Sequence, residues 1–124
     1  MDESEKRILV VDDESVPLTL VARMLTYAGY RVSTARSAGD ALRLLGLEAP
    51  VFDLVVTDLL MPETDGRTLG RLIAERHPAL PVIYMSGYGS TDDLHRGARD
   101  GDLSFLQKPF SSEELVATVQ ALVG

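Results

Sequence analysis

The chain has 124 residues, enough to bury one hydrophobic core but too few for a second catalytic or DNA-binding unit of ordinary size. Its 45% hydrophobic and 25% charged residues are typical of a soluble globular protein and argue against disorder. A net charge of -7, with twelve scattered Lys and Arg and no cysteine, disfavours direct nucleic-acid binding and excludes disulfides and thiolate metal sites.

The N-terminal segment predicts neither an export signal nor membrane insertion. Residues 1–7 are acidic where a signal peptide would be basic, and the apolar run that follows them is too short for a leader. No later stretch approaches the length that spans a bilayer. We therefore expect a cytoplasmic protein, with residues 1–6 as a short tail and residues 7–124 as one domain.

Short apolar runs alternate with longer amphipathic segments, which is typical of repeated βα units around a parallel sheet. The runs predict five strands, at 7–11, 31–35, 53–57, 81–85 and 103–106. Residues 8–11 and 54–57 lack polar alternation, as expected for central strands that helices cover on both faces. The sequence therefore predicts an α/β fold with a doubly wound, five-stranded parallel sheet.

The first two predicted helices have recognisable ends. Pro17 suits the first turn of one helix, and Gly29 offers it a C-terminal stop. Ser37 can cap the N-terminus of the next helix, which we expect to end at Gly46.

Two more helices are predicted with equal clarity. In one, an apolar stripe that includes Arg76 runs up to Pro78, and the proline prevents the helix from continuing. The other begins with Ser111 and Glu114 in capping-box register. Its expected buried residues are Leu115, Val119, Leu122 and Val123.

A further helix, near 91–98, is predicted to be the least stable element. It offers only Leu94 and Ala98 as a clear apolar pair, and it contains Gly97.

Charged and hydroxyl side chains follow four of the predicted strands. Because ligands of an open parallel α/β sheet bind at the carboxyl ends of its strands, these groups are expected to meet at one edge. They are Asp12, Asp13, Asp58, Ser86 and Lys108.

Three carboxylates at one sheet edge predict a divalent cation. Ionised together they would repel one another, and a hard cation with oxygen ligands relieves that repulsion, so Mg2+ is the expected cofactor of Asp12, Asp13 and Asp58. The structural alternative is that Asp12 and Asp13 are turn or cap residues and that Asp58 forms an Asx turn. Lys108 is a compact charge suited to an anionic ligand beside the metal.

With these residues and the loop 58–66, the chain resembles the receiver domains of bacterial two-component response regulators from Arg7 to its end. The resemblance implies the flavodoxin-like strand order 2-1-3-4-5. It also implies that Asp58 is the nucleophile that accepts a phosphoryl group from a histidine kinase phosphohistidine. Asp13, Asp58 and the carbonyl of Leu60 would ligate Mg2+ directly, and Asp12 through water. In this family the Lys108–Pro109 bond is usually cis.

The resemblance further implies a switch and residues that modulate the lifetime of the phosphorylated state. The Ser86 hydroxyl would donate to the phosphoryl group, and the Phe105 ring would fill the space that Ser86 leaves. Many relatives have tyrosine here, so Phe105 lacks a hydroxyl that could bond the neighbouring loop; the alternative is that Phe105 is simply core. Leu60 and Tyr88 stand at positions that flank the path of the hydrolytic water.

The expected output is a contact or onward transfer, because no effector segment follows in the chain as given. The predicted output face consists of the helix near 91–98, the fifth strand and the last helix. Partners would be a histidine kinase and a downstream protein or histidine phosphotransfer partner, with a phosphorylation-dependent dimer as a further state. Sequence around Ser86 and Lys108 is similar to the receivers of hybrid sensor kinases.

Other function classes fit less well. An aspartyl phosphohydrolase would need a larger chain and a second acid near Asp58, so the protein is expected to catalyse only its own phosphorylation and dephosphorylation. A flavin or nucleotide binder would need a glycine-rich first turn where this chain has Asp-Asp-Glu-Ser. A receiver-like scaffold that ignores phosphate would not need the complete acidic set.

Overall fold

The computed structural model describes residues 5–47, 51–61, 65–86 and 105–123. They form a parallel sheet of five strands in the order β2-β1-β3-β4-β5, which confirms the predicted fold class and strand order. The strands are β1 (Arg7–Val11), β2 (Arg31–Ala35), β3 (Leu54–Asp58), β4 (Val82–Ser86) and β5 (Phe105–Gln107).

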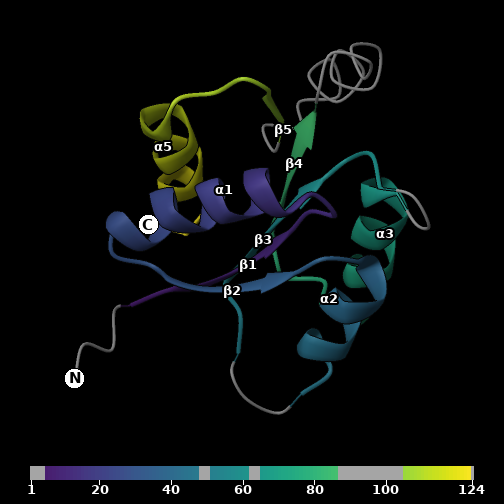
Figure 1. The fold of residues 1–124 in the computed structure, drawn as a ribbon. Helices are drawn as coiled ribbons and strands as arrows, with labels where there is room; N and C mark the ends of the chain where they lie inside the picture. Colours follow the sequence, from purple (N-terminus) through teal and green to yellow (C-terminus); the bar gives the residue numbers. More distant parts are fainter. Residues whose placement is uncertain (1–4, 48–50, 62–64, 87–104, 124) are drawn as a thin grey trace.

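Helices cover both faces of the sheet (Figure 1). The described helices are α1 (Ser15–Tyr27), α2 (Ala38–Leu45), α3 (Gly66–Arg76) and α5 (Ser112–Val123). α1 and α5 pack on one face, and α2 and α3 lie together on the other (Figure 1). The label α4 is kept for the helix predicted near 91–98, which lies outside the described residues.

The two central strands divide the core into two layers. Alternate residues of β1 point to opposite faces, so that Ile8 and Val10 pack with α1 and α5 while Leu9 and Val11 pack with α2 and α3. All four side chains are buried, as are the side chains of β3, which confirms that 8–11 and 54–57 are central strands. Because helices cover both faces of the sheet, polar side chains can reach solvent mainly at the ends of the strands.

Three strands end one residue later than predicted: β3 at Asp58, β4 at Ser86 and β5 at Gln107. β3 includes Asp58 and β4 includes Ser86, because each still has a register partner on its neighbouring strand, Met85 and Gln107 respectively. Asp58 and Ser86 are therefore the last residues of their strands.

Helix ends follow the predicted capping chemistry. Gly29 has φ of 103°, a left-handed conformation that favours glycine, just after α1. The Ser37 Oγ accepts from the Asp40 N–H at 3.0 Å. The Ser111 Oγ accepts from the Glu114 N–H at 3.0 Å while Glu114 Oε1 accepts from the Ser111 N–H at 3.1 Å, so the capping box is confirmed.

Two predicted helix faces need correction. Leu122 was expected to be buried but is 37% exposed, because the core-facing line of α5 follows an i, i+4 ladder through Leu115, Val119 and Val123. Arg76, placed in the apolar stripe of α3, is exposed; its guanidinium stays in water at the C-terminal end of the helix, where a cation is favoured.

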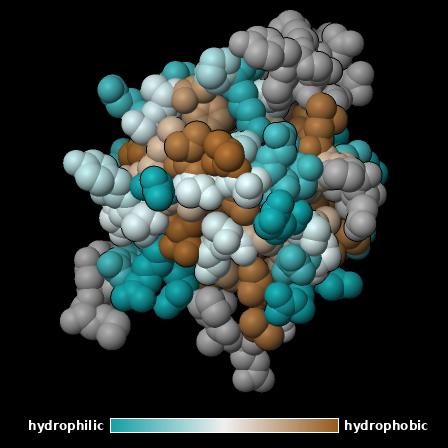
Figure 2. All heavy atoms as spheres, viewed as in Figure 1, coloured by the Kyte–Doolittle hydropathy of each residue, from teal (hydrophilic) through white to brown (hydrophobic). Residues whose placement is uncertain are grey.

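The outer face of α1 carries exposed apolar side chains, from Val16, Leu20 and Tyr27. Figure 2 shows hydrophobic atoms gathered over this helix. None of the described helices combines the length and the apolar character that crossing a membrane requires.

Candidate functional site

Asp12 follows β1 directly and is fully buried. Its N–H donates to the Ala35 carbonyl at 3.1 Å, and its Oδ1 accepts from the Glu14 N–H at 3.0 Å. The second bond is typical of an aspartate in a turn. The alternative role of Asp12 as a turn residue therefore holds for its Oδ1. The other oxygen, Oδ2, has no hydrogen-bond partner among the described residues.

Asp13 is held at its backbone. The Arg36 guanidinium, just after β2, donates to the Asp13 carbonyl at 3.1 Å, which leaves the Asp13 carboxylate to point into the site. This hydrogen bond fixes the Asp13 backbone at the edge of the site.

Asp58 ends β3 and is 7% exposed. The chain behind it is closely packed against the start of α3, because the Gly66 N–H donates to the Leu59 carbonyl at 2.8 Å. A Cβ at Gly66 would lie 2.4 Å from the Asp58 carbonyl oxygen and 2.9 Å from the Leu59 Cα. Only glycine lets α3 approach this closely, so Gly66 determines where the Asp58 loop lies.

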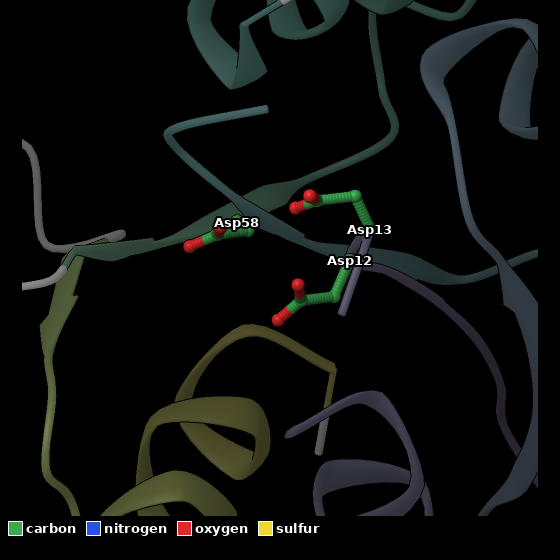
Figure 3. Close-up of side chains that lie close together, drawn as sticks. All are labelled: Asp12, Asp13 and Asp58. Carbon is green, nitrogen blue, oxygen red and sulfur yellow. The ribbon is translucent and has the colours of Figure 1, made fainter. Parts of the chain in front are cut away.

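The three carboxylates converge. Asp12, Asp13 and Asp58 each offer an oxygen, and these oxygens lie within 4.8 Å of one another. Figure 3 shows that two of the side chains leave the end of β1 and the third leaves the end of β3. The parallel pairing of β1 with β3, which aligns Val11 with Thr57, brings these strand ends side by side.

Lys108 completes the cluster from the end of β5. Its Nζ lies 3.2 Å from Asp58 Oδ1 and 3.5 Å from Asp12 Oδ2. The backbone N–H of Lys108 donates to the carbonyl of Ser86, the last residue of β4, at 2.7 Å. The Lys108–Pro109 bond is cis, as the resemblance implied. The predicted convergence of strand ends is thus confirmed.

Burial raises the pKa of the Asp58 carboxyl above its ordinary value. The Lys108 ammonium opposes this increase, and the negative charges of Asp12 and Asp13 add to it. The net direction shows that the single lysine does not fully compensate for desolvation and for two neighbouring carboxylates.

This raised pKa predicts how acid affects stability in buffer that contains EDTA. A carboxyl whose folded pKa is raised contributes stability that is complete below its unfolded pKa and is lost as pH rises through the folded pKa. The unfolding free energy of the parent minus that of Asp58→Asn should therefore increase as pH falls through this window. Urea unfolding of both proteins at several pH values measures it, and a difference that decreases on acidification would contradict the assignment.

The donor set fits a hard divalent cation. All three side chains offer oxygen, and the buried Asp12 Oδ2, which lies 3.5 Å from Lys108 Nζ, accepts no hydrogen bond from the described residues. Lys108 offsets part of the negative charge but contacts only two of the three acids. The cluster therefore supports a metal site, with Mg2+ as a prediction.

The other predicted site residues differ in how far they are exposed. Leu60 is 58% exposed beside the cluster, and Ser86 is 1% exposed at the end of β4. Phe105 is partly buried at the start of β5, and Tyr88 lies outside the described residues. Their roles in metal binding, switching and lifetime stay predictions.

Sequence reasoning missed the contributions of Arg36 and Gly66. Arg36 directly follows β2, so the strand-end rule that identified the acids also pointed to it. Gly66 was treated as part of a loop, and its close approach to Asp58 is visible only in three dimensions.

A family model for the response regulator receiver domain matches residues 8–120. The transcriptional regulatory protein GlrR of Escherichia coli (strain K12) is 37% identical over 119 residues, which cover 96% of this chain and 26% of GlrR. The sensor kinase CckA of Brucella abortus (strain 2308) is 35% identical over 116 residues, which cover 94% of this chain and 12% of CckA. The chain thus spans a small part of these relatives.

Solved structures give the same result. The crystal structure of a response regulator receiver domain protein from Clostridium thermocellum is similar with a TM-score of 0.86 and 30% identity. The match covers 95% of this chain and 94% of that one. Fold similarity and sequence similarity therefore extend over the same, nearly complete, length.

Proposed function

The chain belongs to the response regulator receiver domain family, and on that premise we propose that Asp58 accepts a phosphoryl group from the phosphohistidine of a histidine kinase. One observation carries the proposal: carboxylate oxygens of Asp12, Asp13 and Asp58 lie within 4.8 Å, with the Lys108 ammonium 3.2 Å from Asp58 Oδ1. Receiver domains are modules of two-component signalling, and this acidic cluster with its lysine supports phosphoryl transfer at Asp58.

The transfer needs little from the protein beyond position and charge. An Asp58 carboxylate oxygen attacks phosphorus in line, the new P–O bond forms as the P–N bond breaks, and the departing imidazole takes a proton. Lys108 meets charge on the phosphoryl oxygens, and the Ser86 hydroxyl donates to one of them. The burial of Asp58 and Ser86 limits the screening of these interactions by water.

Asp12, Asp13, Asp58 and the Leu60 carbonyl would hold Mg2+, with Asp12 acting mainly through water. When bound, the ion neutralises charge on the oxygens of the transferred group. Arg36 keeps the Asp13 backbone in place for this task.

Ser86 and Phe105 convert phosphorylation into a change of packing. Ser86 moves toward the phosphoryl group, and the partly exposed Phe105 ring moves into the space it leaves. The output face is formed by α5, β5 and the helix predicted at 91–98, which lies outside the described residues. Beryllofluoride, which mimics the phosphoryl group, should therefore shift NMR signals of Ser86 and Phe105.

Leu60 and Tyr88 would modulate the lifetime of the acyl phosphate by hindering or ordering the hydrolytic water. The chain would catalyse only its own phosphorylation and dephosphorylation. Residues 7–124 would form the receiver after a tail at 1–6, in the cytoplasm. Its output would pass to a downstream protein or histidine phosphotransfer partner, or through a phosphorylation-dependent dimer, without contacting nucleic acid.

Acetyl phosphate tests the proposal, because it is a small donor that bypasses the unidentified kinase. Incubation with Mg2+ should phosphorylate the chain, and excess EDTA should prevent it. Borohydride reduction of the acyl phosphate followed by mass spectrometry should locate the label at Asp58. Labelling at another residue, or labelling that ignores EDTA, would refute the assignment.

A further inference from the structure

Four residues of α3, β4 and β5 form a continuous contact, and the proposed function uses only one of them, Phe105. Phe105 and Tyr84 are register partners on adjacent strands, and their ring centroids lie 5.2 Å apart with planes tilted by 30°. The Arg67 guanidinium carbon lies 5.5 Å from the centroid of the Phe105 ring. We call this group, completed by Gly70, the α3–β5 stack.

Both contacts of the Phe105 ring lie at distances where the interaction is attractive. Aromatic pairs interact favourably at centroid distances of about 4.5–7 Å, and a guanidinium within about 6 Å of a ring centroid is attracted to the ring. Arg67 is partly buried, and partial desolvation strengthens a cation–π contact.

Gly70 leaves room on α3 for the end of the Tyr84 side chain. A Cβ at this position would lie 1.8 Å from the Tyr84 hydroxyl oxygen and 2.8 Å from the ring carbon that bears it. The end of the Tyr84 side chain thus occupies the space that a side chain at Gly70 would take. The Phe105 ring thus contacts Tyr84, whose end packs against α3 at Gly70, and the guanidinium of Arg67.

Arg67 is also next to a backbone contact with the residue that follows Asp58. It directly follows Gly66, whose N–H donates to the Leu59 carbonyl at 2.8 Å. A displacement of Leu59, which directly follows Asp58, would therefore displace the first turn of α3, and with it the guanidinium over Phe105.

We propose that Arg67 is a positioning residue that holds the Phe105 ring in its outer position, and that it couples the Asp58 loop to β5 by a route separate from Ser86. The inference rests on the proposed function, in which Phe105 moves inward from a partly exposed position. The ring is partly exposed while it contacts Arg67, so the contact favours the outer position.

The first test reads the ring directly and does not depend on phosphate chemistry. The chain contains only three phenylalanines, so ring-labelled phenylalanine gives few NMR signals, and Phe105→Leu assigns the relevant one. Arg67→Gln should shift the Phe105 ring signals and leave those of Phe52 and Phe110 in place. The matched control is Arg71→Gln, which removes the same charge from an exposed site one turn further along α3. Equal Phe105 signals in the parent and in both variants would overturn the proposal.

The second test measures coupling. Release of the ring should lower the beryllofluoride concentration that half-saturates Arg67→Gln by about two- to five-fold, the range expected for one cation–π contact. Arg67→Lys keeps the charge without the planar group, so its half-saturating beryllofluoride concentration should lie between those of Arg67→Gln and the parent. A midpoint equal to that of Arg71→Gln, or a higher one, would overturn the coupling.

The two tests separate this inference from the proposed function. If no variant responds to beryllofluoride, the phosphoacceptor proposal fails while the ring signals still report whether Arg67 positions Phe105. If every variant responds equally and the ring signals do not move, the Arg67 inference fails alone.

Discussion

Asp58→Asn is expected to abolish phosphorylation by acetyl phosphate completely. Asparagine keeps the size and burial of the side chain but offers a neutral amide in place of the attacking carboxylate oxygen. It also removes one of the three carboxylates that would bind the metal, so both the nucleophile and the charge that binds the cation are weakened. Phosphate incorporation with Mg2+ present measures the effect, and residual labelling near the parent's rate would disprove the role of Asp58.

A matched control comes from the opposite end of the same strand. Asp53 directly precedes β3, and its Oδ2 accepts from the Arg7 N–H at 2.9 Å. Asp53→Asn makes the same charge change in a partly buried aspartate and should leave labelling intact. If it also abolished labelling, the loss in Asp58→Asn would reflect damage to the fold or to overall charge.

Gly66→Ala is expected to destabilise the fold and to impair phosphorylation together. Its Cβ would lie 2.4 Å from the Asp58 carbonyl oxygen and 2.9 Å from the Leu59 Cα, and both are backbone atoms that cannot rotate away. Such overpacking costs roughly 1–3 kcal/mol of unfolding free energy. The relief of this clash must move either α3 or the loop, so labelling of Asp58 should slow in the folded fraction. Urea unfolding and acetyl phosphate labelling measure the two effects.

Gly39→Ala is the control for this prediction. Gly39 lies in α2, where the nearest atom to its Cβ would be the Ser37 Oγ at 3.9 Å. Alanine should fit there and stabilise the helix by up to about 1 kcal/mol. Equal stability of the two variants would show that the close approach at Gly66 does not matter energetically.

The fold could be predicted because its signals are local. Apolar runs at 8–11 and 54–57 indicate central strands, and Ser37 and Ser111 identify helix starts through capping bonds that depend on neighbours in sequence. Leu122 shows where this reasoning fails, because periodicity defines an apolar face but not which of its edges meets the sheet.

The candidate site could be predicted in part. The rule that ligands bind at the carboxyl ends of parallel strands predicted that Asp12, Asp58 and Lys108 lie together, and the distances confirm their proximity. The rule concerns strand ends, so it says nothing about a helix that approaches the site from outside. Gly66 and the α3–β5 stack were therefore not predicted.

The sequence by itself determined the α/β fold, the central strands and the set of acidic and basic groups at the sheet edge, because each follows from residue type and periodicity along the chain. Only the tertiary structure decided how α3 lies against β3, β4 and β5. That placement brings Gly66 onto the Asp58 backbone and Arg67 over the Phe105 ring. Such contacts join residues that are distant in sequence, and their formation depends on close packing between elements, which no local pattern encodes.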